Sequence, residues 1–198
     1  SRLEAVCTPR PGVIEVAAAM DAPTPEAART FYEAAVADGH EGVMFKNREA
    51  PYQPGTRVGF MMKHKPLMEP LDLIITRAQW SEGRRSAYLG RLFLGCYDRD
   101  TDAICEVGRL STGYTDADLE ALTERLLARK RAVEGRQVTL EQDLLIEVGF
   151  EEIQRSDAYD SGYALGFPRY RRQRPDLGPT DAATLAEVIE AYEAQGVS

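Results

Sequence analysis

Apolar residues recur with helical spacing in the N-terminal part of the chain. Thr24, followed by proline, suits the N-cap and first position of a helix. Phe31 and Ala35 lie about one turn apart on its apolar stripe, and Gly39 ends it. This segment therefore predicts one amphipathic helix, and the short apolar run at residues 13–16 predicts a strand before it.

From residue 71 onward, short apolar runs separated by turns predict strands. The expected strands are residues 71–76, 87–97, 103–110, 137–140, 144–153 and 167–172. One helix with Asp116 as its N-cap interrupts them, and a second apolar stripe predicts a terminal helix from Thr180. Several short strands around one helix are typical of a small closed barrel such as the OB-fold.

A segment with two prolines, residues 65–70, predicts a linker. We therefore expect two domains, residues 1–68 and 69–198, and an α+β fold class. The net charge of −8 comes entirely from residues 69–198, because the first 68 residues carry equal numbers of basic and acidic side chains. An acidic domain is poorly suited to nucleic acid unless it carries a local basic patch, and its acidity also suits solubility or a salty cell.

Composition also bears on where the protein acts. No apolar run approaches the length of a membrane span, and no signal-like segment opens the chain. The cysteines, Cys7, Cys96 and Cys105, are odd in number and widely spaced, which disfavours a disulfide framework or a zinc site. We expect small core cysteines in an intracellular protein of the cytoplasm or nucleoid, or of the nucleus in a eukaryote.

The first candidate site combines a carboxylate with lysines. Glu41 precedes an extended run that ends at Lys46, while Lys63 and Lys65 share one face of another extended segment. A carboxylate beside lysines can bind a phosphate group together with Mg²⁺ and neutralise charge on a phosphoryl group in transfer. Strand charges are also often simply solvated, so the spacing alone leaves both interpretations open.

Two arginine-rich segments are further candidates. Gly83-Arg84-Arg85 is a plausible phosphate clamp in a loop, since arginine binds phosphate through two parallel hydrogen bonds. The segment from Arg169 to Arg174 concentrates four arginines within the acidic domain. Solvated loop charge and a structural salt-bridge network are the alternative interpretations.

These segments resemble motifs of ATP-dependent DNA ligases of the archaeal and eukaryotic replicative type. The matching segments, in the family's order, are Glu41–Lys46, Tyr52–Gly55, Lys63–Pro66, Trp80–Arg85, Ser111–Asp116 and Phe167–Asp176. The resemblance covers nearly the whole chain. It implies the C-terminal piece of a nucleotidyltransferase (adenylation) domain at residues 1–68, followed by an OB-fold β-barrel with a C-terminal helix at residues 69–198.

The resemblance implies the sealing of nicks in duplex DNA through enzyme-AMP and DNA-adenylate intermediates, in DNA replication, repair or recombination. It implies that Glu41 binds Mg²⁺, and that Lys63 and Lys65 act in catalysis and bind the α-phosphate of ATP or AMP. It also implies that ATP and its pyrophosphate are bound by Arg169, Arg172 and Arg174. The DNA backbone would be contacted by Gly83, Arg84 and Arg85. The resemblance supports a site role for Lys46 less strongly.

The chain departs from the family pattern in several places. Leu177 stands where a lysine normally follows Asp176, Gly166 where arginine is common, and residues 60–62 where the family has a tryptophan. The Lys-x-Asp-Gly tetrapeptide with the family's nucleophilic lysine does not occur in the sequence. We therefore expect a C-terminal fragment that does not adenylylate itself and needs the upstream ligase segment with its DNA-binding domain. A sliding clamp is a further expected partner.

Two other interpretations share parts of the pattern. RNA ligases and mRNA-capping nucleotidyltransferases have similar fourth and fifth motifs, but the segments Gly83–Arg85 and Ser111–Asp116 favour a DNA ligase. A non-catalytic OB module would bind single strands by aromatic stacking. The single tryptophan and the lack of an aromatic ladder along the strands argue against that module.

Overall fold

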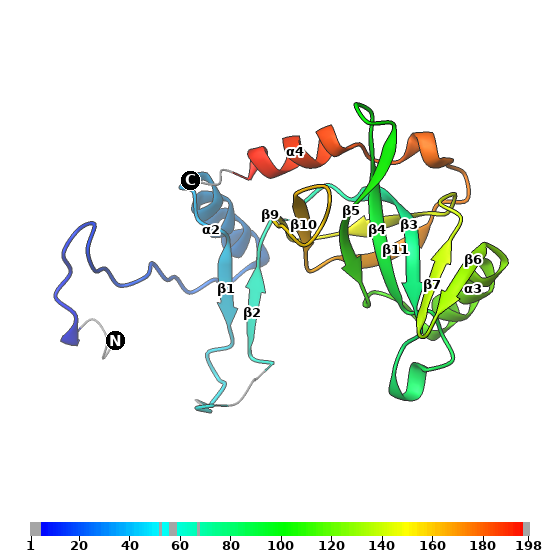
Figure 1. Ribbon diagram of the computed structural model, residues 1–198. Coiled ribbons are helices and arrows are strands. Elements are labelled where there is room, and N and C mark those ends of the chain that lie inside the picture. The colour runs from blue at the N-terminus through cyan, green and yellow to red at the C-terminus, as the bar shows by residue number, and fades with distance from the viewer. Residues whose placement is uncertain (1–4, 52, 56–58, 67, 196–198) are drawn as a thin grey trace. The chain divides into compact units, whose positions relative to one another are not determined.

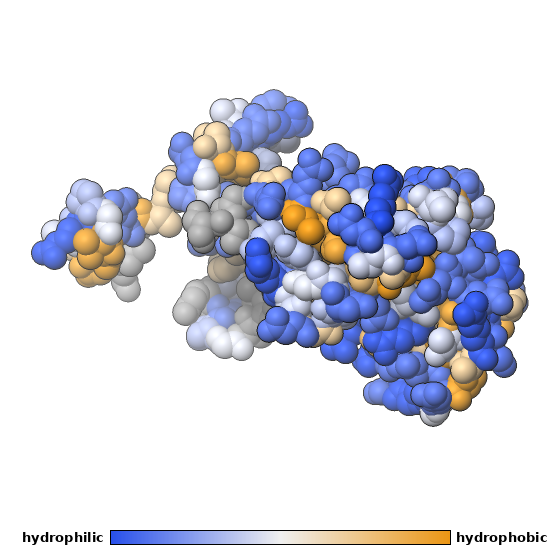
Figure 2. All heavy atoms as spheres, turned by 45° about the horizontal axis from the view of Figure 1, so that its top comes forward, coloured by the Kyte–Doolittle hydropathy of each residue, from blue (hydrophilic) through white to orange (hydrophobic). Residues whose placement is uncertain are grey.

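The computed structural model describes residues 5–51, 53–55, 59–66 and 68–195. Contacts divide the chain into two compact units, Ser1–Pro66 and Leu67–Ser198, called here the first and the second unit (Figure 1). Both helices and strands are present, which confirms the predicted α+β class. The hydrophilic residues dominate the face of the molecule in Figure 2, and hydrophobic ones form small separate groups.

The first unit contains a helix and a two-stranded hairpin. Its elements are α2 (Pro25–Ala37), β1 (Val43–Lys46) and β2 (Met61–His64). The helix begins as predicted, because the Thr24 hydroxyl accepts a hydrogen bond from the Ala27 N–H at 3.2 Å. The strand predicted at residues 13–16 is wrong: the described part of this region forms only one bridge, between Arg10 and Ile14, and has no adjacent strand to extend it.

The second unit is built mainly from strands. They are β3 (Leu71–Gln79), β4 (Arg91–Asp98), β5 (Ala103–Leu110), β6 (Lys130–Glu134), β7 (Gln137–Leu140), β8 (Leu145–Gly149), β9 (Glu152–Arg155), β10 (Tyr163–Gly166) and β11 (Arg169–Gln173). The helices are α3 (Asp116–Ala128) and α4 (Leu185–Ala194), with single 3₁₀ turns η1 (Gly83–Arg85) and η2 (Pro179–Asp181).

Antiparallel pairing joins most of these strands in the order β11-β8-β3-β4-β5, and β7 pairs with both β3 and β6. The long strand β3 therefore holds the sheet together. Its inward residues, such as Leu73 and Ile75, join a buried cluster with α3 residues Leu119, Leu122 and Leu126. The second unit thus has the core of a self-supporting domain.

Most strand predictions are confirmed, and the exceptions have local causes. The strands at 103–110 and 137–140 are as predicted, but the one at 144–153 divides into β8 and β9. Strand β6 was not predicted. All five of its residues are exposed, so its sequence lacks the alternation of apolar and polar residues that marks a half-buried strand.

The starts of two helices also differ from the predicted ones. Thr115, not Asp116, is the N-cap of α3, since its hydroxyl accepts from the Asp118 N–H. The terminal helix begins at Leu185 rather than Thr180, because Pro179–Asp181 forms a separate 3₁₀ turn.

Candidate functional site

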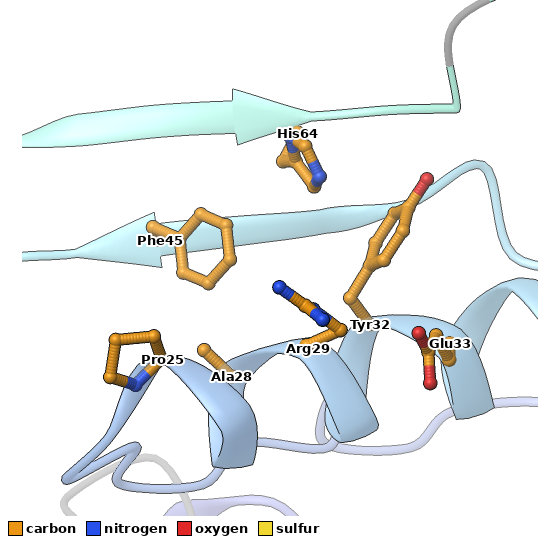
Figure 3. A pocket seen from close by; sticks show the side chains of 7 residues that line it. All are labelled: Pro25, Ala28, Arg29, Tyr32, Glu33, Phe45 and His64. Carbon is orange, nitrogen blue, oxygen red and sulfur yellow. The ribbon is translucent and has the colours of Figure 1, made fainter.

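The two faces of the β1–β2 hairpin carry different residues. Phe45 and His64 lie on the face that packs against α2, and the His64 ring lies 4.5 Å from the Tyr32 ring, centroid to centroid (Figure 3). Directly opposed residues share a face in an antiparallel pair. The register pairs Met44 with Lys63, so both lie on the face away from the helix.

Glu41 and Lys65 meet beside this outer face. The Lys65 ammonium lies 2.7 Å from Glu41 Oε2, and the Lys65 side chain is only 18% exposed. Gly42 makes the approach possible: its φ is +139°, and a Cβ there would lie 2.1 Å from the His64 carbonyl oxygen. Glycine at this position therefore lets the chain bring Glu41 to Lys65 without that collision.

The charges around Glu41 favour its ionised form. The hydrogen bond from Lys65, followed by the charges of Lys65 and Lys63, lowers the pKa of the Glu41 carboxyl below its usual value. The register pairs Lys46 with Met61, which puts Lys46 on the same outer face as Lys63. This arrangement suits an anion such as a phosphate group, because the lysines outnumber the carboxylate.

One exposed carboxylate also limits what metal could bind. The described residues contain no group of three or more histidine, cysteine, aspartate or glutamate side chains that could hold a metal ion. Mg²⁺ commonly uses one or two carboxylates together with water and substrate phosphate oxygens. Glu41 could supply one such carboxylate.

In the second unit, a β-bulge explains how two consecutive arginines reach one carboxylate. The β11–β8 register shifts between Tyr170 and Arg172, so Arg171 is the extra residue. Arg172 Nη2 lies 2.6 Å from Glu147 Oε2, and Arg171 Nη1 lies 3.8 Å from Glu147 Oε1. Gly149 leaves space for Arg171, because a Cβ there would lie 2.6 Å from its Nε.

Arg174 is held differently from Arg171 and Arg172. Its guanidinium lies 2.5 Å from Asp72 Oδ2 and 2.8 Å from Asp176 Oδ2, and the side chain is only 17% exposed. The hydrogen bond from Arg174 lowers the pKa of Asp176 to about 2. Asp72 is on β3, so Arg174 ties the end of β11 to the central strand.

Just before β11 lies an aromatic residue that the sequence analysis quoted within a matching segment but did not assign to the site. Phe167 is 65% exposed and has φ +52°, a conformation that non-glycine residues seldom adopt. Arg169 beside it is exposed, with its Nη2 4.0 Å from Glu151 Oε1. The Thr112 carbonyl accepts from the Tyr170 N–H at 2.9 Å, so the loop after β5 lies against this strand. The one available signal was an aromatic residue directly before a proline.

The arginines of the Gly83–Arg85 turn have separate surroundings. Arg85 Nη2 lies 2.7 Å from Asp116 Oδ1, which joins the turn to the first residue of α3. Arg84 is exposed and forms no ion pair with any residue that the structure describes. Arg84 is thus the more available of the two for an external anion.

The departures from the family pattern have local explanations. Leu177 packs against a small apolar cluster that includes Ile74 and Leu145, so apolar packing replaces a lysine there. A Cβ at Gly166 would lie 2.5 Å from Glu152 Cγ, which makes glycine the easier residue at that point. Of the matching segment Tyr52–Gly55, Tyr52 lies outside the described residues.

The predicted site residues thus fall into two groups. Glu41, Lys63 and Lys65 come together in the first unit. The arginines predicted to bind ATP lie on or directly after β11 in the second unit, and the predicted DNA contacts form η1 of that unit.

Comparison with known proteins finds two matching families. The family described as "ATP dependent DNA ligase domain" matches residues 1–65, and "ATP dependent DNA ligase C terminal region" matches residues 85–177. Among curated relatives, a DNA ligase of Halobacterium salinarum is 43% identical over 98% of this chain. A DNA ligase of Nanoarchaeum equitans is 44% identical over 83% of it.

The chain spans about a third of the length of these relatives, 34% and 30% respectively. The solved ligase domain of M. tuberculosis LigD has a similar fold, with a TM-score of 0.51 and 23% identity over 77% of this chain and 50% of that one. None of the helices in the described residues is long and apolar enough to cross a membrane.

Proposed function

Because the chain belongs to the ATP-dependent DNA ligase family, we propose that it supplies phosphate- and DNA-binding surfaces to an enzyme that seals nicks in duplex DNA. The first unit would be the C-terminal portion of the adenylation domain, and the second an OB-fold domain. The observation that carries this proposal is the gathering of Glu41, Lys63 and Lys65 beside one face of the β1–β2 hairpin, while the other face packs on α2.

The lysines would act on the α-phosphate of ATP. Lys63 and Lys65 can each donate hydrogen bonds to phosphate oxygens and neutralise the negative charge that builds up during adenylyl transfer. Lys65 would be oriented by its ion pair with Glu41. When bound, Mg²⁺ would supply further charge neutralisation at the same phosphates, with Glu41 as its ligand.

The arginines of β11 would bind the other phosphates of ATP. The side chains of Arg169 and Arg172 are exposed, at 67% and 64%, and each forms an ion pair with a single carboxylate. To bind an anion, Arg174 would release Asp176, which is the more exposed of its two carboxylate partners, and pair with the anion instead. We propose that all three orient pyrophosphate as the leaving group.

Nicked duplex DNA would lie against the second unit. The exposed guanidinium of Arg84 suits a backbone phosphate, with Gly83 allowing close approach and Arg85 fixing the turn. Phe167 is an exposed apolar side chain of the kind that contacts the minor groove. A segment with the Lys-x-Asp-Gly nucleophile would be needed for enzyme-AMP formation, and we propose that the ligase acts inside the cell with a DNA-binding domain and a sliding clamp.

Binding to DNA tests the proposal. We expect the chain to bind a nicked duplex more tightly than a single strand of equal length, with affinity that falls steeply as salt is raised. Arg84→Ala should reduce the slope of log affinity against log salt concentration by about the amount expected for one lost phosphate contact. Arg99→Ala, at an exposed arginine in the β4–β5 turn, is the matched control. Equal affinity for both DNAs would contradict the proposal and support a single-strand module.

A further inference from the structure

Two cysteines on neighbouring strands face each other in the core of the second unit. Cys96 on β4 and Cys105 on β5 are directly opposed in the strand register. Their sulfur atoms lie 3.4 Å apart, and both are free thiols. The expectation of small core cysteines is therefore right for this pair, whereas Cys7 is only partly buried.

The surrounding sheet already fixes the geometry of the pair. Cys96 is 0% exposed and Cys105 is 8% exposed, and both belong to the main hydrophobic cluster. Leu92, Leu94 and Cys96 alternate along β4 toward that cluster, so the Cys96 side chain is directed inward with them. A disulfide needs the sulfur atoms at about 2.05 Å, a further approach of little more than an ångström.

The two thiols are also chemically different. The hydrogen bond between the two thiols lowers the pKa of Cys105, whereas the same hydrogen bond and burial raise the pKa of Cys96. Cys105 is also the one that retains some exposure. It is therefore the thiol that a small oxidant meets first and the one that ionises more readily.

We propose that Cys96 and Cys105 form an oxidation site, at which hydrogen peroxide closes a cross-strand disulfide between β4 and β5. The Cys105 thiolate attacks one peroxide oxygen, the O–O bond breaks, and hydroxide leaves, which gives a sulfenic acid on Cys105. The Cys96 sulfur then attacks the Cys105 sulfur. The S–S bond forms, the S–O bond breaks, and the Cys96 proton leaves with the hydroxyl group as water. Overall, two thiols lose two electrons and two protons, and one peroxide becomes two water molecules.

The effect of this cross-link follows from the position of the pair. It would close a short loop within a hairpin that is already formed, and so restrict the unfolded chain without a large change in the native one. The strands it joins are flanked by the Gly83–Arg85 turn and the Ser111–Asp116 loop. The charged residues of these loops lie outside the cross-link, so oxidation is expected to raise the thermal stability of the second unit and leave its charged surface in place.

Intact-mass and peptide mass spectrometry test the proposal on the full chain. After peroxide treatment, denaturation and alkylation, we expect a mass lower by two hydrogen atoms, one alkylated thiol at Cys7, and a peptide pair joined through Cys96 and Cys105. Dithiothreitol should restore all three thiols. In Cys7→Ser the same cross-link should form, and in Cys96→Ala it should not. Three alkylated thiols, a bond to Cys7, or sulfinic acid at Cys105 with Cys96 still free would each overturn the proposal.

Thermal unfolding supplies an independent measurement. The oxidised chain should melt several degrees above the reduced chain, and Cys105→Ala should melt at the same temperature with and without peroxide. An equal melting temperature for oxidised and reduced wild-type chains would contradict the proposed position of the cross-link. Neither experiment depends on DNA or ATP binding, so failure here would leave the proposed function untouched.

Discussion

The two units hold their charged residues in different ways. In the first unit, none of the described residues is buried, and Glu41, Lys63 and Lys65 lie on or beside a short exposed hairpin. In the second unit, Arg172 and Arg174 are fixed to carboxylates on strands of a well-packed sheet. We therefore expect the charges on the hairpin to contribute to ligand binding more than to stability, and the arginines of the second unit to contribute to both.

The largest effect is expected from a lysine of the hairpin. In a ligase reassembled with an upstream segment, Lys63→Ala should slow nick sealing roughly 10²–10³-fold, because one donor to the phosphoryl group is lost. The melting temperature should stay the same, since Lys63 is exposed. Single-turnover sealing measures the rate. Lys130→Ala, at an exposed lysine of β6, is the control, and near-normal sealing by Lys63→Ala would remove Lys63 from the site.

In the core of the second unit, the expected effect of a substitution is on stability. Leu94→Ala should lower the free energy of unfolding by about 3 kcal/mol, because it leaves a cavity under the sheet. Val13→Ala, at an exposed apolar position of the first unit, should change it by less than about 0.5 kcal/mol. Urea denaturation measures both. Similar losses for the two variants would remove the contrast between the units.

A glycine of the hairpin should give a smaller effect than Lys63. Gly42→Ala combines a disfavoured positive φ with a collision at the His64 carbonyl, at a cost of about 1–3 kcal/mol, and so should separate Glu41 from Lys65. Sealing should fall roughly 10- to 100-fold if that cost appears in the transition state. Gly59→Ala, where an added Cβ meets nothing within 4 Å, is the matched control. Equal activity of the two variants would show that the approach of Glu41 to Lys65 is not needed.

The smallest effect concerns the acid sensitivity of the second unit. Burial raises the pKa of Glu106, but hydrogen bonds from Arg77 and Thr76 outweigh it, so the pKa lies below its usual 4.5. A lowered folded-state pKa gives stability that is present above the unfolded value and lost as pH falls through the folded value. For this partly exposed pair we expect less than about 1 kcal/mol.

Urea denaturation at a series of pH values, from about pH 6 to about pH 3, would measure this loss. Glu106→Gln should be less stable than wild type at the upper end and approach it at the lower end. Glu124→Gln, at an exposed position of α3, should follow the wild-type curve. A Glu106→Gln curve parallel to wild type would contradict the assignment.

Local pattern was enough to predict much of this structure. Alternation along residues 63–65 correctly separated the outward lysines from His64, which packs on α2. The strand at 103–110 has a buried and exposed pattern that its sequence shows directly.

Features that depend on distant parts of the chain could not be predicted. Arg174 is paired with Asp72, 102 residues away, and the bulge that gives Glu147 two arginines depends on the register of β11 with β8. The contact between Cys96 and Cys105 spans only nine residues, but it too requires the exact pairing of β4 with β5. A sequence pattern specifies which face a residue takes, but not which strand lies opposite it.

Transfer of labelled AMP tests the central claim most directly. The chain would be mixed with a ligase segment that bears Lys-x-Asp-Gly and with α-labelled ATP, and the rate of protein labelling would be measured. We predict that the chain alone takes up no label, and that the mixture labels the added segment at a rate that falls sharply in the Lys63→Ala/Lys65→Ala variant. Labelling of the chain alone, or an equal rate with the double variant, would contradict the assignment of the hairpin face to the nucleotide.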